Sequence, residues 1–279
     1  LEGRTEPVYH PVRRADAAGL RDVKRKPVYT KFWTPSTMSV AALLCVTLVS
    51  IIQSLFGVGV LLFGTPLLLL LGYKFVDTLL ILLPISVSIN LLQVLKHHVH
   101  IDTGFYKRIL LYTIPFVVLC LFLVTRTRIN IDPIIGLFLV FVALKAVSAP
   151  IERLVGRLVH HERTYLAITG IVHGLLNLGG SLLIALVHSK GHEKDVTRVT
   201  IAAAYATFAL FQILTLMLSL RQIDIPFSTN ALYLGAGVLA FALTERFIYA
   251  KLDSARYSRI FAGFLFVSGL LLVGRSVLF

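Results

Sequence analysis

Long apolar runs separated by short charged stretches dominate the chain. They fall at roughly 38–72, 76–95, 105–125, 130–149, 164–189, 195–220, 229–250 and 257–278. Most of them are near the ~20 residues that a membrane-spanning helix needs. We predict an all-α, polytopic membrane protein, because the continuous runs lack the alternation that is typical of transmembrane β-barrels.

The first run is too long for a single crossing. As one helix, residues 38–72 would extend about 52 Å, against a hydrocarbon core of ~30 Å. We predict a break at Gly57-Val58-Gly59, because glycine accepts backbone conformations that other residues resist. The arms at 38–56 and 60–72 are then too short, or barely long enough, to cross.

A second break lies about 120 residues later, at Asn177-Leu178-Gly179-Gly180-Ser181. Paired interrupted segments in two halves of a chain point to the binding site of a transporter. The repeat continues beyond the breaks, where recurring polar positions pair Asp77 with Asp195, Gln93 with Gln212, Asp102 with Asp224, and Asp132 with Asp253. Asp77 and Asp195 fit the N-caps of helices, although matched acidic residues could also act as a gate.

These patterns divide the chain into four parts. We expect a basic cytoplasmic tail at 1–34, a first transmembrane repeat at 35–149, a basic linker at 150–163 and a second repeat at 164–279. Each half holds one glycine-broken segment and three transmembrane helices. If each broken segment folds back, the halves are inverted, and if it crosses once, they are parallel. The arm lengths favour the inverted repeat, whereas the Lys and Arg residues of the loops divide almost evenly.

Composition agrees with a membrane protein. The chain is 57% hydrophobic and 15% charged, whereas soluble domains carry about 25% charged residues. The net charge of +13 does not indicate nucleic-acid binding, because basic residues near helix ends orient membrane proteins and contact anionic lipid. The basic tail predicts a multi-pass protein of the inner (cytoplasmic) membrane. The tail itself is either a surface-lying leader or a docking arm.

The chemistry inside the apolar runs is neutral and polar. No Asp, Glu, Lys or Arg lies at the centre of a span, and the polar set comprises Gln53, Ser54, Thr65, Ser86, Ser88, Asn90, Gln93, His173, Asn177, Ser181, Tyr205, Thr207 and Gln212. A helix that restarts after a break directs free N–H groups toward the gap. We expect the amides of residues 59–61 and 180–182 to supply such groups for an oxyanion. The predicted substrate contacts are Gln53, Gly57, Gly59, His173, Asn177, Gly179, Gly180 and Ser181, with Asn90, Gln93 and Gln212 behind them.

Each of these features has a structural alternative. Gly-x-Gly in a membrane segment also serves close helix packing, and buried carboxamides also join helices. His173 could carry a coupled proton or be a plain structural histidine. His97, His98 and His100 resemble a metal cluster but fit a span end better, so we expect no metal and no cofactor. No catalytic arrangement is recognisable, so we do not expect an enzyme. A homodimer is compatible with the sequence.

The breaks resemble those of the sulfite exporter TauE/SafE family. Its hallmark is Gly-x-Gly-Gly-Gly followed by apolar residues and a proline, once in each half. Here Gly57-Val58-Gly59-Val60-Leu61 with Pro66 matches the first copy, and residues 177–181 match the second. Val60 and Leu61 replace two glycines, and Asn177 and Ser181 replace the outer glycines of the second copy. The similarity covers about 40–279.

The resemblance implies a secondary transporter of small sulfur-containing anions, such as sulfite, sulfoacetate or other organosulfonates, working by alternating access. Some relatives are linked to other organic anions, which is the alternative function, and a membrane-embedded enzyme is a more distant one. The departures from the glycine pattern imply that the substrate or its orientation differs from that of glycine-rich relatives. Polar specificity is expected to come mainly from the second break.

Overall fold

The computed structural model describes residues 39–56, 59–127, 130–145, 148–219, 227–248 and 254–278. The described residues all belong to one compact unit. The predicted tail and Gly57 lie outside the described residues. The described part is helical throughout, with short connections, and comprises α1 (Val40–Phe56), α2 (Val60–Leu70), α3 (Phe75–His97), η1 (His98–His100), α4 (Thr103–Arg126), α5 (Asp132–Lys145), α6 (Ala149–Val159), α7 (Glu162–Leu176), α8 (Gly180–Ser189), α9 (Lys194–Ser219), α10 (Phe227–Ile248) and α11 (Ser254–Leu278).

Each broken segment folds back on itself. In the first, the side chain of Tyr73, just beyond α2, lies near enough to interact with those of Ser39, just before α1, and Tyr233 of α10. The Ser39 amide also donates to the Tyr233 hydroxyl at 3.0 Å. In the second, Lys190, just beyond α8, pairs with Glu162 at the start of α7, with 2.6 Å between Nζ and Oε2. The α1–α2 and α7–α8 segments are therefore helical hairpins whose two outer ends lie together.

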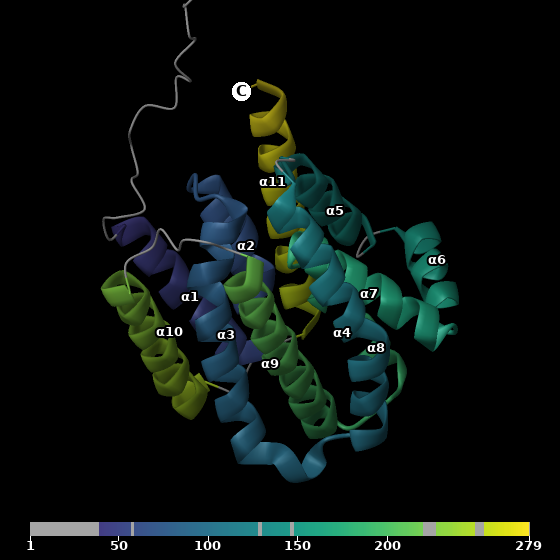
Figure 1. Ribbon diagram of the computed structural model, residues 1–279. Helices are drawn as coiled ribbons and strands as arrows, with labels where there is room; N and C mark the ends of the chain where they lie inside the picture. Colours follow the sequence, from purple (N-terminus) through teal and green to yellow (C-terminus); the bar gives the residue numbers. More distant parts are fainter. Residues whose placement is uncertain are drawn as a thin grey trace, which may run out of the picture. The chain divides into compact units, whose positions relative to one another are not determined.

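The helices pack in corresponding pairs. Helix α1 packs on α10 and α7 packs on α4, while α3 packs on α9 and α5 packs on α11. Figure 1 shows α3 and α9 at the centre, with α1 and α10 on one side and α4 and α7 on the other. Exchanging the two predicted repeats converts the α1–α10 pair into the α7–α4 pair and maps the other two pairs onto themselves. The predicted repeat boundaries themselves stay a prediction.

The central helices α3 and α9 run in opposite directions. Lys96, at the end of α3, and Arg198, near the start of α9, both pair with Glu245 of α10. The outer end of the first hairpin directly precedes α3, and that of the second directly precedes α9. The outer ends of the two hairpins therefore lie at opposite ends of the bundle. An inverted orientation of the halves across a membrane stays a prediction.

The pair α5 and α11 crosses at two glycines. A Cβ added to Gly136 would lie 2.7 Å from the Gly269 carbonyl oxygen, and one added to Gly269 would lie 2.6 Å from the Gly136 carbonyl oxygen. No side chain fits at this crossing, which is the close approach that small residues permit between membrane helices.

Four helices in the described part are long and apolar enough to cross a membrane. They are Phe75–Lys96, Thr103–Arg126, Asp195–Ser219 and Phe227–Glu245. Helix α5 has 14 residues, which is about 21 Å. It is long enough to cross a membrane only if it is taken together with α6, and α6 is bent from it by 100°. The hairpin arms and Gly263–Ser276 of α11 are shorter apolar helices. Helix α6 lies in the stretch that the sequence analysis described only as a basic linker, without a helix.

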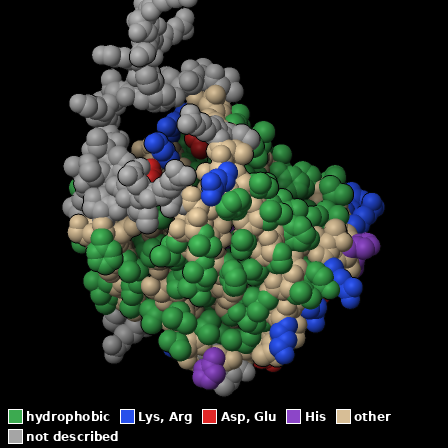
Figure 2. Space-filling model, viewed as in Figure 1, with side chains coloured by type: hydrophobic (Ala, Val, Ile, Leu, Met, Phe, Trp, Pro, Cys, Tyr) green, Lys and Arg blue, Asp and Glu red, His purple; other side chains and the backbone are tan. Residues whose placement is uncertain are grey.

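Apolar side chains also cover the outside of the bundle. Leu44, Leu95, Leu111, Leu214 and Leu239 are each at least 53 % exposed, and Figure 2 shows hydrophobic side chains over most of the visible face. A large exposed apolar surface marks a contact with a membrane or a partner. Together with the four spans, it identifies a membrane protein.

Candidate functional site

The first break is closed by its own side chains. Gln53, in the last turns of α1, accepts a hydrogen bond from the Val60 amide at 2.8 Å through Oε1. Its Nε2 donates to Asn90 Oδ1 of α3 at 3.0 Å. Asn90 in turn donates from Nδ2 to the Ser86 carbonyl and hydroxyl at 2.7 and 3.0 Å. The Val60 amide, which we expected to be free for an anion, is thus occupied within the protein.

The second break is built around Asn177. This residue ends α7 with a φ of 62°, the left-handed conformation that asparagine tolerates better than most side chains. Its Nδ2 donates to Thr65 Oγ1 of α2 at 2.9 Å, and its Oδ1 accepts from Gln212 Nε2 of α9 at 3.3 Å. Asn177 is 1 % exposed. Its carboxamide therefore joins the second hairpin to the first hairpin and to a central helix.

Two glycines allow close approach at the second break. A Cβ added to Gly179 would lie 2.4 Å from the Thr169 carbonyl oxygen and 2.6 Å from His173 Cβ, so α8 begins directly against α7. A Cβ added to Gly180 would lie 1.1 Å from the Tyr205 hydroxyl oxygen. The Tyr205 side chain of α9 therefore places its hydroxyl against the first residue of α8.

Buried polar groups without partners gather at the second break. Among the described residues, neither ring nitrogen of His173 makes a hydrogen bond, nor does the Tyr205 hydroxyl or Gln212 Oε1. The Gln212 carboxamide is near enough to interact with His173 without reaching hydrogen-bond geometry. The His173 ring lies 6.1 Å from the Tyr205 ring and 4.9 Å from the Phe208 ring, between centroids. Because buried polar groups are normally paired, this cluster is the best candidate for a ligand site.

The repeat accounts for the difference in polar pairing between the two breaks within the described ranges. At the spacing of about 120 residues, His173 takes the place of Gln53, Tyr205 takes that of Ser86, and Ala209 takes that of Asn90. The chain of hydrogen bonds from Gln53 through Asn90 to Ser86 has no equivalent there, because alanine has no polar group. The side chains that would close the second break have diverged.

The predicted site residues therefore fall into two groups. Gln53, Gly59 and Asn90 lie at the first break, and His173, Asn177, Gly179, Gly180, Ser181 and Gln212 lie at the second. The amides of Ser181 and Leu182 donate to the Leu178 and Gly179 carbonyls at 3.3 and 3.1 Å. We had expected these amides to be free for an oxyanion, and that expectation is wrong. Gln93 is 2 % exposed, and neither of its polar atoms has a partner within the described ranges.

Sequence reasoning missed a charged cluster beside the first break. Arg198 of α9 donates to the Ser54 carbonyl at 3.4 Å and pairs with Glu245 Oε1 at 3.2 Å, while Lys96 lies 3.7 Å from Glu245 Oε2. The Thr244 hydroxyl also donates to the Ser54 hydroxyl at 2.7 Å. The cluster fixes the end of α1 to α9 and α10. These charged residues lie near helix ends in the sequence, where charges are usual, so no sequence signal distinguished them.

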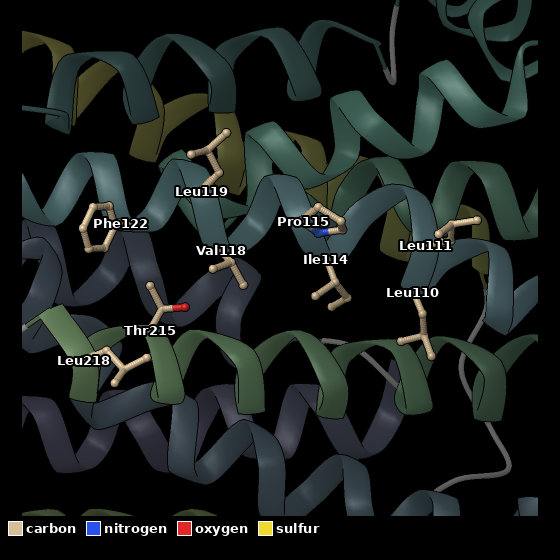
Figure 3. Close-up of a pocket in the computed structure, with 9 residues that line it drawn as sticks. All are labelled: Leu110, Leu111, Ile114, Pro115, Val118, Leu119, Phe122, Thr215 and Leu218. Atoms are coloured by element: carbon tan, nitrogen blue, oxygen red, sulfur yellow. The ribbon is translucent and has the colours of Figure 1, made fainter.

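Two grooves on the surface are too apolar to be candidates for an anion site. The larger holds about 550 Å³ between α4 and α9 and is lined by side chains such as Leu111, Pro115, Phe122 and Leu218 (Figure 3). Its single polar side chain, Thr215, bonds back to the Phe211 carbonyl at 2.7 Å. A second groove lies between α3 and α10 and is also mostly apolar. Both suit lipid chains rather than an anion.

The second break is built from neutral polar side chains. In the described ranges, no group of three or more His, Cys, Asp or Glu residues could hold a metal ion, and Cys45 and Cys120 are free and buried apart. The polar atoms at hand are imidazole nitrogens, a phenol hydroxyl and carboxamides. The phenol hydroxyl, the N–H of a neutral imidazole and the N–H groups of a carboxamide can donate hydrogen bonds to oxyanion oxygens without a fixed counter-charge.

A comparison with protein families matches residues 42–272 to the family described as sulfite exporter TauE/SafE. No curated protein and no solved structure matches the chain. The match covers both hairpins and α3 to α10, and so it includes both breaks.

Proposed function

Because the chain belongs to the sulfite exporter TauE/SafE family of membrane transporters, we propose that it carries a small sulfur-containing anion, such as sulfite, sulfoacetate or another organosulfonate. The observation that supports this proposal is the cluster of buried, unpartnered polar groups of His173, Tyr205 and Gln212 at the second break. The substrate would occupy this cluster and accept hydrogen bonds from the Tyr205 hydroxyl and from the N–H of the His173 ring, whereas the unpartnered Gln212 Oε1 is itself an acceptor. A different small organic anion is the alternative substrate.

Recognition in this proposal depends on neutral donors. A sulfonate or sulfite group offers three oxygens as acceptors. The Tyr205 hydroxyl of α9 and the N–H of the neutral His173 ring of α7 are the donors beside the start of α8. Buried neutral donors bind an oxyanion without holding it as tightly as a buried cation would, because their charge-assisted hydrogen bonds carry no full ion pair. A transporter must release its substrate, so this donor set suits the task.

Alternating access would arise from movement of one half against the other. The proposal includes an inverted repeat in the inner membrane, and it is supported by the antiparallel α3 and α9 and by hairpins whose outer ends lie at opposite ends of the bundle. Transporters with inverted repeats hold substrate near the midplane, between broken helices. The carboxamide of Asn177 supports such a junction, because it bonds Thr65 of the first hairpin and Gln212 of a central helix.

Flux of radiolabelled sulfite and sulfoacetate into proteoliposomes tests this function. We expect saturable flux in the wild type, and loss of flux in Tyr205→Phe, which removes one hydroxyl that has no partner among the described residues. Thr215→Val, in the outer apolar groove, is the matched control and should transport normally. Absence of flux for every sulfur-containing anion, in folded protein, would overturn the substrate class. Normal flux in Tyr205→Phe would overturn the assignment of its hydroxyl.

Proton coupling through His173 is a further part of the proposal. His173 is fully buried, and the Gln212 carboxamide lies near enough to its ring to interact with it. A pH gradient imposed across the same proteoliposomes should then change the rate of substrate accumulation, and His173→Gln should remove that effect. Flux that ignores the pH gradient would limit His173 to substrate contact.

A further inference from the structure

Helix α6, between the two predicted repeats, has an apolar edge that the rest of the described chain leaves uncovered. Leu154 is 53 % exposed and Leu158 is 40 % exposed, whereas Val155 is 4 % exposed and faces the bundle. At about 100° per residue, Leu154 and Leu158 lie on neighbouring positions beside Val155. The apolar side of α6 is therefore wider than the strip that the bundle covers.

A basic edge lies next to the exposed leucines. Arg153 and Arg157 are exposed and continue around the helix from Leu154, and His160, His161 and Arg163 follow in the exposed connection and the start of α7. Glu152 is the sole acidic residue of α6. Figure 2 shows Lys, Arg and His side chains along the edge of the molecule where Figure 1 draws α6. An amphipathic helix with leucines on one side and arginines beside them is typical of a membrane interface.

The position of α6 in the bundle agrees with an interface. It is bent by 100° from α5, so it turns away from the direction of a membrane-spanning helix. It also directly precedes Glu162, which forms ion pairs with Arg108 of α4 and with Lys190. Charged side chains gather at the ends of membrane helices, at the level of the lipid headgroups. The charged neighbours thus place α6 at that level.

We propose that α6 lies in the membrane interface and binds anionic phospholipid, with Leu154 and Leu158 among the acyl chains and Arg153 and Arg157 on the headgroup phosphates. The occupant is the bilayer rather than a protein, because the exposed leucines continue the apolar outer surface of the bundle and the adjoining charges are positive. Juxtamembrane basic residues are attracted to anionic lipid by about 1 kcal/mol each. This role does not depend on the substrate or on transport.

Site-directed labelling of the full-length protein in nanodiscs tests the depth of α6. With Cys45 and Cys120 replaced by alanine, Leu154→Cys and Gly156→Cys each carry one bimane label. Gly156 is exposed and has no atom within 4 Å of an added Cβ, so it is the matched control on the same helix. We expect lipid-borne nitroxide to quench the label at 154 several-fold more than the label at 156, and aqueous iodide to do the reverse.

Lipid composition tests the anionic part. Quenching by lipid nitroxide at 154 should increase when phosphatidylglycerol is added to phosphatidylcholine nanodiscs, and the double variant Arg153→Gln/Arg157→Gln should abolish that increase. Arg126→Gln, exposed at the end of α4, is the control and should keep it. Equal quenching by iodide at 154 and 156 would overturn the interfacial position. A label at 154 that neither iodide nor lipid nitroxide quenches would also overturn it, because protein rather than lipid would then cover Leu154. Equal quenching in both lipid mixtures would overturn the preference for anionic lipid.

Discussion

Gln53 and His173 occupy the same position in the two hairpins, yet their replacement by leucine should have opposite consequences. Gln53 bonds the Val60 amide and Asn90, so Gln53→Leu leaves two buried groups without a partner. His173 makes no hydrogen bond among the described residues, so His173→Leu removes none. We therefore expect Gln53→Leu to reduce stability, and His173→Leu to reduce transport with little change in stability.

The size of the difference follows from the contacts. Each buried polar group that loses its partner costs about 1–3 kcal/mol, so Gln53→Leu should cost about 2–6 kcal/mol. In membranes the average hydrogen bond between helices contributes only about 0.6 kcal/mol, which favours the lower part of that range. His173 packs against the Tyr205 and Phe208 rings, and a leucine can fill much of the same space, so the change should stay below about 1.5 kcal/mol.

The protein carries its own reporter for this measurement. Cys45 and Cys120 are both buried, so a thiol-reactive fluorogenic dye reacts as the bundle opens on heating. Gln53→Leu should lower the midpoint of that reaction clearly in detergent, while His173→Leu should leave it close to the wild type and lose flux in proteoliposomes. Equal midpoints for Gln53→Leu and the wild type would refute the account of the first break as a self-closed network. A large drop in His173→Leu would show that its ring has a structural partner.

Three further changes test other parts of the structure. Gly179→Ala should cost about 1–3 kcal/mol, because its Cβ would lie 2.4 Å from a backbone oxygen, whereas Gly235→Ala, with open space around it, should be neutral in the same thermal assay. Asn177→Gly keeps the left-handed backbone but removes the carboxamide that bonds Thr65 and Gln212, so both the thermal midpoint and the flux should fall, whereas Gly235→Ala should change neither. Burial raises the pKa of Glu162, but hydrogen bonds from Lys190 and Arg108 outweigh it and hold the pKa below its usual value. The contribution of Glu162 to stability is therefore present above its ordinary pKa of about 4.3 and is lost as the pH falls through the lowered pKa. We expect the thermal midpoint of Glu162→Gln to fall less than that of the wild type when the pH is lowered through this range.

The positions of the breaks could be predicted from the sequence, because glycine pairs inside overlong apolar runs leave few other places for a helix to stop. The helices end at Phe56 and Leu176 and restart at Val60 and Gly180, and the predicted family and all-helical class are confirmed. The partners of the polar side chains could not be predicted in the same way. The bond from Asn177 to Thr65 joins residues 112 positions apart, and only the fold determines such a pairing.

The short span of α5 and the helix α6 also escaped prediction. Residues 130–149 are apolar enough for a transmembrane helix, but α5 ends at Lys145 and the chain then bends. The basic residues of 150–163 hid the leucines of α6, since charge rather than periodicity dominates that stretch. The closure of the first break by Gln53 was likewise hidden, because a glutamine in a membrane segment can bond a ligand, another helix or its own backbone.

The pairing of Gln53 with Val60 spans seven residues of the chain, which bears on how the protein is made. The first hairpin can satisfy its own break as soon as both arms have left the ribosome. Each hairpin also has a partner in the central helix that follows it. Gln53 donates to Asn90 of α3, 37 residues further on, and Asn177 accepts from Gln212 of α9, 35 residues further on. The polar network of each break is therefore complete only after the next central helix has been synthesised, which imposes an order on assembly.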